Sequence, residues 1–431
     1  MINWLINHLL KNRYVYDKAK NAYNRATKEQ GRQDLTDIPE ATPFRMEASE
    51  IKEARINLLV PALSEQHVFG GISTALRFYE ELIEYFPSAR IIVTDETSTQ
   101  LKDKQYYSSW KVKDIGEKDI SDNVIVVAGN RIGKQLFIRE NDYFVSTAWW
   151  TAINAFRMLD WQEKQFSLNL QRKQVYFIQD YEPGFYAWSA RYALADATYR
   201  KQSKTIAIFN TKLLSEYFSQ KGYNHEVAYH FDPVLNPVLK AKAEKSHNPK
   251  KLKRILFYGR PSVERNLFPL IIQSLRLWVE NNPNASDWEV LSAGEDHEPI
   301  DLGRGVMAKP LGKLSLEEYS KVLEETSVGV SLMLSPHPSY PPLEMAAFGV
   351  RVVTNNYENK DLTKLVSNLD TPVTLDPQDI SLSIANACDA HDEKSRCEIR
   401  NDVFTNESSE FPFVKQVANI LISDTKGKDI G

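Results

Sequence analysis

One segment late in the chain combines residue types that could bind both an anion and a hydroxyl group. It reads Ser-Pro-His-Pro-Ser-Tyr-Pro-Pro-Leu-Glu from Ser335 to Glu344 and leads from an expected strand into an expected helix. Its prolines fix the turn and remove backbone donors. Tyr340 and Leu343 keep their N–H groups near the positive end of the helix dipole, where an anion is favoured. Glu344, in the first helical turn, either caps the helix or accepts a hydroxyl proton.

Three cations lie just past the ends of expected strands. Arg260 and Arg265 are in the turn that follows the strand Arg254–Tyr258, and Lys313 comes directly after Leu311-Gly312. Arginine offers a planar donor fork that lysine lacks, so two guanidinium groups at one strand-to-helix turn suit a diphosphate. The alternative is that all three side chains are ordinary solvated surface charges.

A glycine pair in the first half of the chain could approach the same kind of ligand. Gly70-Gly71 follows an expected strand and opens an expected helix. At such a turn the backbone can come close to a phosphate and direct its N–H groups at it. A tight turn without any ligand is the structural alternative.

Polar residues among aromatic ones follow two further strands of the same half. Gln179, Asp180 and Glu182 come just past the strand Gln174–Ile178, and Trp149-Trp150 follows the strand Tyr143–Thr147. Carboxylates and amides bind sugar hydroxyl groups, and aromatic rings pack against the C–H surface of a sugar. An aromatic edge of the core is the alternative in both places.

Metal chemistry has no support in the sequence. The eight histidines have no paired spacing, and no Asp-x-Asp motif is present that would hold a metal-bound sugar nucleotide. Cys388 and Cys397 form no zinc pattern and are interpreted as packing residues. We therefore expect neither a metal nor a cofactor.

Composition places the chain among soluble globular proteins. It has 431 residues, of which 42% are hydrophobic and 26% charged, so two or three domains are expected. A net charge of −4 gives no basic excess for nucleic acid. No apolar run approaches the roughly 18–20 residues of a membrane span, and no secretion signal is present. A cytoplasmic location is expected, either free or on the inner face of the cell membrane.

The N-terminal segment differs in charge from the rest. Residues 1–33 are expected to form an amphipathic helix with a net charge of +5 and with Trp4, Leu5, Leu9 and Leu10 at one end. Such a helix could contact an anionic membrane peripherally, or it could pack on the protein body. Residues 34–50 contain Pro39 and Pro43 and are interpreted as a linker, so 1–50 forms the first division.

Two series of alternating strands and helices follow, which is typical of parallel, doubly wound sheets. Residues 51–235 contain the first series, with strands expected at 56–62, 90–94, 124–128, 143–147, 174–178, 205–209 and 226–230. A lysine-rich, apolar-poor stretch at 232–253 marks the domain boundary. Residues 250–415 contain the second series, with strands expected at 254–258, 289–291, 328–334 and 350–354, and residues 416–431 form a tail. A ligand would lie in the cleft, facing the carboxyl ends of both sheets.

Taken together, these motifs resemble a GT-B glycosyltransferase of the large retaining family with a Glu-x7-Glu motif, glycosyltransferase family 4. The resemblance covers residues 56–415 and depends on Gly70-Gly71, Gly259-Arg260, Arg265-Asn266, Leu311-Gly312-Lys313 and the stretch from Pro342 to Gly349. The stretches Phe177–Tyr186 and Ala148–Ala152 are most similar to WsaF-type bacterial rhamnosyltransferases. The implied fold is two facing Rossmann-like domains with an N-terminal helical extension.

This resemblance implies a substrate and a role for each motif. The donor would be dTDP-β-L-rhamnose, and a retaining, metal-independent transfer to a rhamnose-containing, lipid-carried acceptor would build a β-linked rhamnan or S-layer type of glycan. Arg260 and Arg265 would hold the diphosphate, and Glu344 would bind the nucleoside sugar. Leu311 to Lys313, which include Gly312, would border the nucleobase, and Lys313 could also reach a phosphate. Tyr340 and Leu343 would present N–H groups, while Gly70 and Gly71 would let the first domain approach the donor. Gln179, Asp180 and Glu182 are the candidate catalytic groups, and Trp149 and Trp150 the acceptor contacts.

The chain departs from the family pattern at one motif position. The first Glu of Glu-x7-Glu, which binds hydroxyl groups of the transferred sugar, is replaced by Pro336, so His337 becomes the candidate sugar contact. The family also often has a His where Gln179-Asp180 stands. Alternatives are therefore a UDP- or GDP-sugar donor, a GT-B sugar-nucleotide epimerase, or a non-catalytic glycan-binding protein. Arg260, Arg265 and Glu344 argue against the last.

Overall fold

A computed structural model describes most of the chain, namely residues 37–64, 70–101, 107–168, 171–232, 234–245, 251–391 and 410–423. The expected N-terminal helix at 1–33 and Cys397 lie outside the described residues. The chain divides into two compact units, 1–43 and 44–431. In the first unit the structure describes a short 3-10 turn, η1 (Pro39–Ala41), and all elements below belong to the second.

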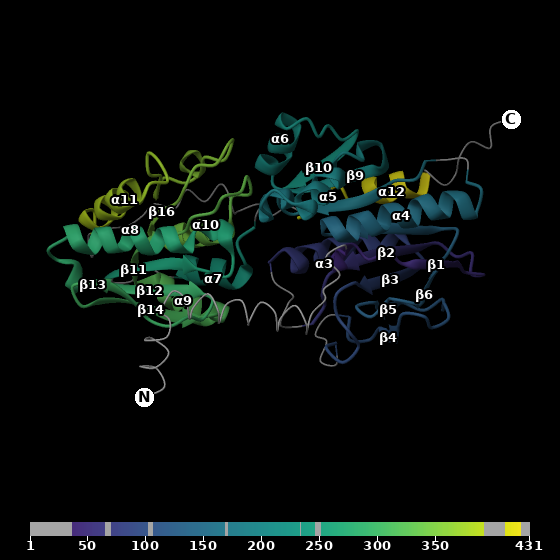
Figure 1. Cartoon of the computed structure of the whole chain (residues 1–431), viewed down its shortest axis with the longest axis horizontal. Coiled ribbons are helices and arrows are strands. Elements are labelled where there is room, and N and C mark those ends of the chain that lie inside the picture. The colour runs from purple at the N-terminus through teal and green to yellow at the C-terminus, as the bar shows by residue number, and fades with distance from the viewer. Residues whose placement is uncertain are drawn as a thin grey trace, which may run out of the picture. The chain divides into compact units, whose positions relative to one another are not determined.

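Eight parallel strands form the first sheet, in the order β10-β9-β8-β7-β2-β3-β5-β4. Figure 1 labels β10, β9, β2, β3, β5 and β4 of this sheet. They are β2 (Arg55–Val60), β3 (Ser88–Val93), β4 (Lys111–Asp114), β5 (Val124–Val127), β7 (Asp142–Ser146), β8 (Gln174–Ile178), β9 (Thr205–Asn210) and β10 (Val227–Phe231). The seven strands expected from the sequence are confirmed. The eighth, β4, was missed because it is largely exposed and polar, so it has no apolar pattern.

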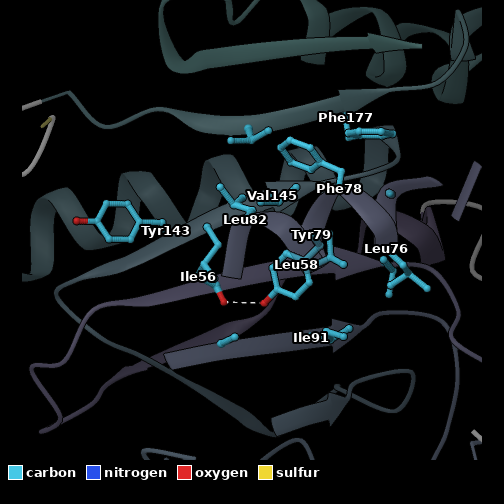
Figure 2. Close-up of a cluster of buried hydrophobic side chains, with 14 of the residues drawn as sticks. Ile56, Leu58, Leu76, Phe78, Tyr79, Leu82, Ile91, Tyr143, Val145 and Phe177 are labelled. Carbon is cyan, nitrogen blue, oxygen red and sulfur yellow. Dashed lines mark hydrogen bonds between the residues drawn. The ribbon is translucent and has the colours of Figure 1, made fainter. Parts of the chain in front are cut away.

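Helices cover both faces of this sheet because its central strands are buried on both sides. They are α3 (Gly70–Leu82), α4 (Trp149–Gln165), α5 (Ala190–Tyr199) and α6 (Lys212–Gln220). Alternate residues of β2 enter different cores, since Leu58 packs with α3 whereas Leu59 packs with α4. Figure 2 shows the first of these cores, where the Tyr79 hydroxyl donates to the Ile56 carbonyl at 2.9 Å. Short 3-10 turns occur at η2 (Ile83–Tyr85), η3 (Glu182–Phe185) and η4 (Gln202–Lys204).

A second, two-stranded parallel sheet pairs β1 (Arg45–Ala48) with β6 (Gln135–Ile138). The strand β1 lies within residues 34–50, which the sequence indicated as a linker. Its residues Arg-Met-Glu-Ala are half-buried or exposed, so the strand exists because β6 offers a pairing edge and not because its own pattern demands it. This tertiary pairing is invisible to local pattern analysis.

The C-terminal helix α12 (Val414–Ser423) packs into the core of the first sheet. Phe411, just before it, lies edge-on to Phe78 with ring centroids 5.5 Å apart, and Arg77 forms an ion pair with Glu410 at 2.8 Å. The expected division ended the second domain at 415 and left a tail from 416 onward. The structure instead returns residues 410–423 to the first domain, a long-range contact that the helix pattern alone cannot reveal.

Seven strands form the second sheet, in the order β13-β14-β12-β11-β15-β16-β17. They are β11 (Leu252–Gly259), β12 (Glu289–Gly294), β13 (Ile300–Gly303), β14 (Val306–Gly312), β15 (Thr326–Val330), β16 (Arg351–Val353) and β17 (Leu369–Asp370), and only the β13–β14 pairing is antiparallel. The four strands expected here are confirmed, and β13, β14 and β17 are additional. The expected pair of doubly wound domains is therefore confirmed.

The helices of this domain again occupy both faces of the sheet. They are α7 (Pro237–Lys245), α8 (Phe268–Asn281), α9 (Leu316–Glu325), α10 (Tyr340–Ala347) and α11 (Pro377–Asp389), with 3-10 turns at η5 (Glu264–Asn266), η6 (Ala285–Asp287) and η7 (Leu362–Lys364). A capping box opens α9, since Ser315 Oγ accepts from the Glu318 N–H at 3.2 Å and the Ser315 N–H donates to the Glu318 carboxylate at 2.9 Å. The helix α7 lies within the expected boundary stretch, and its Leu239 joins the core with α9 and α10.

Both sheets change winding direction at their central strands, which places a crevice at the carboxyl ends of those strands. In the first sheet the chain winds outward from β2 in both directions, and in the second from β11. No helix in the described part of the chain is both long and apolar enough to span a bilayer.

Candidate functional site

A cavity of about 780 Å³ opens at the carboxyl ends of strands from both sheets. The first domain contributes residues at the ends of β8 and β9 and the start of α3, and the second contributes residues after β11, β12 and β14. Of the residues singled out from the sequence, nine line this cavity, namely Gly71, Gln179, Asp180, Arg260, Arg265, Lys313, His337, Tyr340 and Glu344. Their volume and chemistry are those of a small-molecule site at a topological switch point.

Arg260 is held at the cavity wall by a carboxylate that the sequence analysis did not single out. Its Nε lies 3.3 Å from Oε1 of Glu295, which also accepts from the Ser262 hydroxyl at 2.5 Å, and the other carboxylate oxygen, Oε2, accepts from the Ser262 N–H at 3.0 Å. Burial alone would raise the pKa of Glu295, but these hydrogen bonds and the Arg260 charge lower it. The position of Glu295, directly after β12 at a strand end, was the signal that could have identified it.

Arg265 is held more loosely than Arg260. Its guanidinium carbon lies 4.1 Å from the centroid of the Phe185 ring, a cation–π arrangement. Its Nε is 3.8 Å from Oδ2 of Asp180, beyond hydrogen-bond distance, and has no hydrogen-bond partner among the described residues. A buried donor without a partner is costly, so this guanidinium can gain from an anionic ligand in the cavity.

Asp180 is tied to the loop that precedes α10. Its Oδ1 accepts from the Ser335 hydroxyl and, at 2.8 Å, from the Tyr181 N–H. The Ser335 hydroxyl oxygen in turn accepts the His337 N–H at 3.0 Å. Asp180 therefore positions the His337 loop in addition to lining the cavity. Ser335 stands at the start of the segment already singled out, although no role was assigned to it.

His337 is held in one tautomer by its own loop. The Ser339 N–H donates to Nδ1 at 3.0 Å, so Nδ1 is unprotonated and Nε2 carries the hydrogen. Burial lowers the pKa of His337 to about 4, which keeps the ring neutral at pH 7. Nε2 has no partner among the described residues, so the ring presents an unused N–H donor in a residue that lines the cavity.

Glu344 and the first turn of α10 lie at another wall of the cavity. Burial raises the pKa of Glu344 to about 7, against a hydrogen bond from the Tyr319 hydroxyl that lowers it. Pro341 and Pro342 have no N–H, so the backbone donors at this end of the helix belong to Tyr340 and Leu343. The Leu343 side chain is in the core, and Leu343 is not among the residues that line the cavity.

The two motif glycines Gly71 and Gly312 suit their positions for different structural reasons. A Cβ at Gly71 would come within 1.8 Å of the Gln179 side chain, whose Nε2 donates to the Gly71 carbonyl at 2.7 Å. Glycine at this position therefore permits the observed close approach of the Gln179 side chain, which a Cβ would displace. Gly312 has φ +62°, a left-handed conformation that favours glycine, and it directs the chain so that Lys313 reaches the cavity. Gly70 begins α3 beside Gly71.

The structure does not bring Glu182 and Trp149 to the cavity. Glu182 accepts from the hydroxyls of Tyr176 at 2.9 Å and Tyr199 at 3.3 Å, and burial raises its pKa to about 8. Trp149 is fully buried, with Nε1 donating to the Tyr186 hydroxyl at 2.9 Å. The aromatic-edge alternative thus describes both residues, because helix α4 and turn η3 direct them inward.

Trp150 is partly exposed next to Trp149, and it too is outside the cavity lining. Its Nε1 donates to Asp95 Oδ2 at 3.1 Å.

One further buried cation, Lys360, was missed by the sequence analysis. Its Nζ donates to the Met333 carbonyl at 2.9 Å, and burial lowers its pKa to about 8. No three His, Cys, Asp or Glu side chains within the described ranges are close enough together to hold a metal ion.

Comparison with known proteins gives matches to both domains. The N-terminal domain model of WsaF matches residues 55–212, and the WsaF C-terminal domain model matches residues 253–385. The O-antigen biosynthesis protein RfbC of Myxococcus xanthus is 31% identical over 316 residues, which cover 69% of this chain and 21% of that protein. The chain therefore spans about a fifth of the length of this relative.

Solved structures with a similar fold have much lower sequence identity. An E. coli trehalose-6-phosphate synthase structure bound with UDP-2-fluoro glucose has a TM-score of 0.50 at 9% identity, covering 87% of this chain and 96% of the other. HepE of Anabaena, in complex with UDP and glucose, has a TM-score of 0.49 at 14% identity, covering 85% and 99%.

Proposed function

The chain belongs to the WsaF family of GT-B glycosyltransferases, and from that premise we propose that it transfers rhamnose from dTDP-β-L-rhamnose to a growing bacterial cell-surface glycan. The configuration at the anomeric carbon is retained, so the product is a β-linked rhamnose. One observation carries the proposal: Arg260, Arg265, Lys313 and Glu344 line a single cavity at the carboxyl ends of both sheets. The similarity to an O-antigen biosynthesis protein supports a surface glycan as the product.

In this proposal the diphosphate of the donor lies between Arg260 and Arg265. Negative charge grows on the departing oxygen as the glycosidic bond breaks, and fixed positive groups stabilise that charge at little cost in reorganisation. The Arg265 guanidinium lies over the Phe185 ring and 3.8 Å from Asp180, and its Nε has no hydrogen-bond partner among the described residues, so it can turn toward a phosphate without breaking a hydrogen bond of that atom. Arg260 keeps its contact with Glu295, which fixes the guanidinium in place.

The nucleoside occupies the opposite wall. Glu344 accepts hydrogen bonds from the hydroxyl groups of the nucleoside sugar, with Tyr319 orienting its carboxylate. The Leu311–Lys313 loop borders the base, and the N–H groups of Tyr340 and Leu343 face the donor.

The sugar is then transferred from the diphosphate to the acceptor hydroxyl group. The bond between the anomeric carbon and the diphosphate oxygen breaks, and a bond from the acceptor oxygen forms on the same face. The acceptor proton passes to the departing diphosphate oxygen. Gln179 and Asp180 line the cavity from the first domain and bind hydroxyl groups of the reacting sugars.

His337 contacts the transferred sugar where the family uses a glutamate. Its Nε2–H donates to a sugar oxygen, and the neutral ring avoids placing a second positive charge beside an anomeric carbon that becomes positive. The His337 N–H, a hydrogen-bond donor, thus takes the place of the carboxylate acceptor of the first motif glutamate, which is Pro336 in this chain.

The acceptor is carried on a lipid at the inner face of the cell membrane in this proposal. Residues 1–33, with a net charge of +5, hold the enzyme there, since each basic residue near an anionic surface contributes about 1 kcal/mol. Equal binding of the full chain and a chain starting at residue 34 to anionic liposomes would contradict this step.

The decisive experiment incubates the protein with dTDP-rhamnose, UDP-sugars or GDP-sugars and short synthetic rhamnosides. We expect transfer from dTDP-rhamnose alone and a β-linkage by NMR. Transfer from another donor would replace the rhamnosyl assignment, and release of an altered sugar nucleotide without acceptor would replace transfer with epimerisation.

Thymidine diphosphate should stabilise the fold by about 2.7 kcal/mol at a hundredfold excess over its Kd. The same stabilisation is expected when EDTA is present.

A further inference from the structure

Trp188 is the most exposed of the large apolar side chains in the described part of the chain, with 95% of its surface accessible. Tryptophan is highly buried on average, so such exposure calls for a physical reason. The residue directly precedes Ser189, whose Oγ caps helix α5 by accepting the Tyr192 N–H at 3.3 Å. An apolar side chain before a cap commonly packs onto the first turns of the helix. The exposure of Trp188 excludes that packing, so its ring adds little to the fold.

The backbone on both sides of Trp188 is held in place. Tyr186 donates its N–H to the Pro183 carbonyl at 3.2 Å, and its hydroxyl accepts from the buried Trp149 at 2.9 Å. On the other side, the Ser189 cap begins α5. Trp188 therefore stands at a defined position, with an anchored residue two positions before it and a helix directly after it.

That position is next to the cavity. Phe185 lines the cavity and supports the Arg265 guanidinium. Three residues of chain span at most about 10 Å, so the Trp188 backbone lies within about 10 Å of the cavity-lining Phe185, outside the lining itself. It stands on the first domain, away from the wall that binds the nucleoside in the proposed function. A chain that leaves the cavity on this side would pass the indole.

The surroundings of Trp188 favour a sugar over a membrane or a protein. Its neighbours Ala187, Ser189 and Ala190 are small and exposed, so they leave the indole faces open. Between residues 184 and 193 only Arg191 is charged, whereas an interfacial membrane segment needs several basic residues beside its apolar ones. A stable protein interface needs roughly 1,000 Å² of buried surface with several anchors. A single open aromatic face matches the flat C–H surface of one sugar ring.

We propose that Trp188 is a stacking platform for the acceptor glycan, binding a sugar unit behind the one that carries the reacting hydroxyl group. The inference rests on the proposed function, because it takes the glycan as the acceptor. A 6-deoxysugar suits the platform well, since its methyl group extends the apolar face. The enzyme would thereby bind elongated acceptors more tightly than single sugars.

The test compares Trp188→Ala and Trp188→Phe with the full-length protein. Val373→Ala is a matched control, because Val373 is 93% exposed on the other domain. Kinetics are measured with a single rhamnoside and with an oligosaccharide of several units. We expect Trp188→Ala to raise KM for the long acceptor about threefold to tenfold, the scale of one aromatic contact. The kcat, the donor KM and the KM for the single sugar should stay unchanged, and Trp188→Phe should recover most of the loss.

Different failures lead to different conclusions. Equal KM values of wild type and Trp188→Ala for the long acceptor would overturn the platform. Loss of binding to phosphatidylglycerol vesicles, with unchanged acceptor KM, would also overturn it and would assign Trp188 to the membrane. If the wild-type protein transfers no sugar, the proposed function fails. Calorimetry of oligosaccharide binding in the absence of donor then tests the role of Trp188 separately. Weaker binding by Trp188→Ala than by wild type would support the platform, and equal binding would overturn it.

Discussion

Charged side chains gather in two buried regions of the protein, and the two regions hold them in different ways. The first region is an ion network at the amino ends of the first sheet, formed by Arg55, Arg90, Arg139, Asp119 and Asp142. Arg55 and Asp142 are register partners at the starts of β2 and β7, joined by hydrogen bonds of 2.7 and 2.8 Å. Asp119 accepts from Arg55 at 2.5 Å and from Arg139 at 2.9 Å.

The second region is the cavity at the carboxyl ends, where partners are incomplete. Arg265 Nε and His337 Nε2 have no hydrogen-bond partner among the described residues. The pKa values of buried carboxyl groups also differ between the two regions. Burial alone would raise the pKa of Asp142, but Arg55 and Arg90 lower it, whereas burial raises the pKa of Glu344 to about 7.

The difference separates stability from binding. Fully paired charges leave nothing for a ligand to satisfy, and removing one partner leaves the others buried without compensation. Incompletely paired charges reduce stability but can gain from a ligand, which is typical of functional sites. The same residue types therefore support the fold at one edge of the sheet and a ligand at the other.

The largest expected effect follows from breaking the ion network. Asp142→Ala leaves Arg55 and Arg90 without their buried counterion and should lower the free energy of unfolding by about 3–5 kcal/mol. Urea and thermal unfolding midpoints measure this loss. Asp122→Asn removes the exposed ion pair with Lys111 and should leave both midpoints unchanged. A stable Asp142→Ala protein would show that the network is dispensable.

The next effect concerns the arginines of the cavity. Arg260→Ala and Arg265→Ala should each lower kcat roughly tenfold to two-hundredfold, because a charge-assisted contact that strengthens in the transition state is worth about 1.5–3 kcal/mol. Unfolding midpoints should be unchanged, in contrast to Asp142→Ala. A raised donor KM with full kcat would place these arginines in ground-state binding only.

A smaller effect is expected at Glu344, which binds a part of the donor that does not change during reaction. Glu344→Gln should raise the donor KM about fivefold to thirtyfold, for a loss of about 1–2 kcal/mol, with kcat nearly unchanged. The ionised carboxylate is the better acceptor, so kcat/KM for the donor should rise with pH through about 7 in the wild type. This rise should disappear in Glu344→Gln. A large loss of kcat with intact donor binding would instead give Glu344 a catalytic role.

The smallest effect on activity is expected at Glu182, which is buried away from the cavity. Glu182→Gln should change kcat less than about twofold, because the carboxyl is held mainly protonated below pH 8. A pKa raised by folding means that the folded state keeps a proton that the unfolded state loses. The contribution of Glu182 to the stability of the wild type should therefore fall as pH rises from about 5 to 8, so the stability difference between wild type and Glu182→Gln should change in that direction across this range. A strong loss of activity would return Glu182 to the catalytic candidates.

The sequence by itself determined most strands of the two large sheets, the order of the two domains and the residues at the ends of those strands. The pattern of buried runs such as Ile56–Val60 fixes a strand locally, and polar residues after such runs, including Arg260 and Asp180, lie at the carboxyl edge of a parallel sheet. The cavity-lining cations and Glu344 were predictable for this reason. The family motifs in addition predicted a nucleotide sugar as the ligand of these residues.

Only the tertiary structure decided which candidates reach the cavity. Glu182 and Trp149 lie in the same kinds of motif as Asp180, but turn η3 and helix α4 direct them into the core, which no residue spacing reveals. Glu295 was missed since its role depends on meeting Arg260 across neighbouring strands. The strand β1 and the return of α12 to the first domain depend on partners far along the chain. Burial and pairing between distant residues are properties of the packed chain, so local sequence cannot determine them.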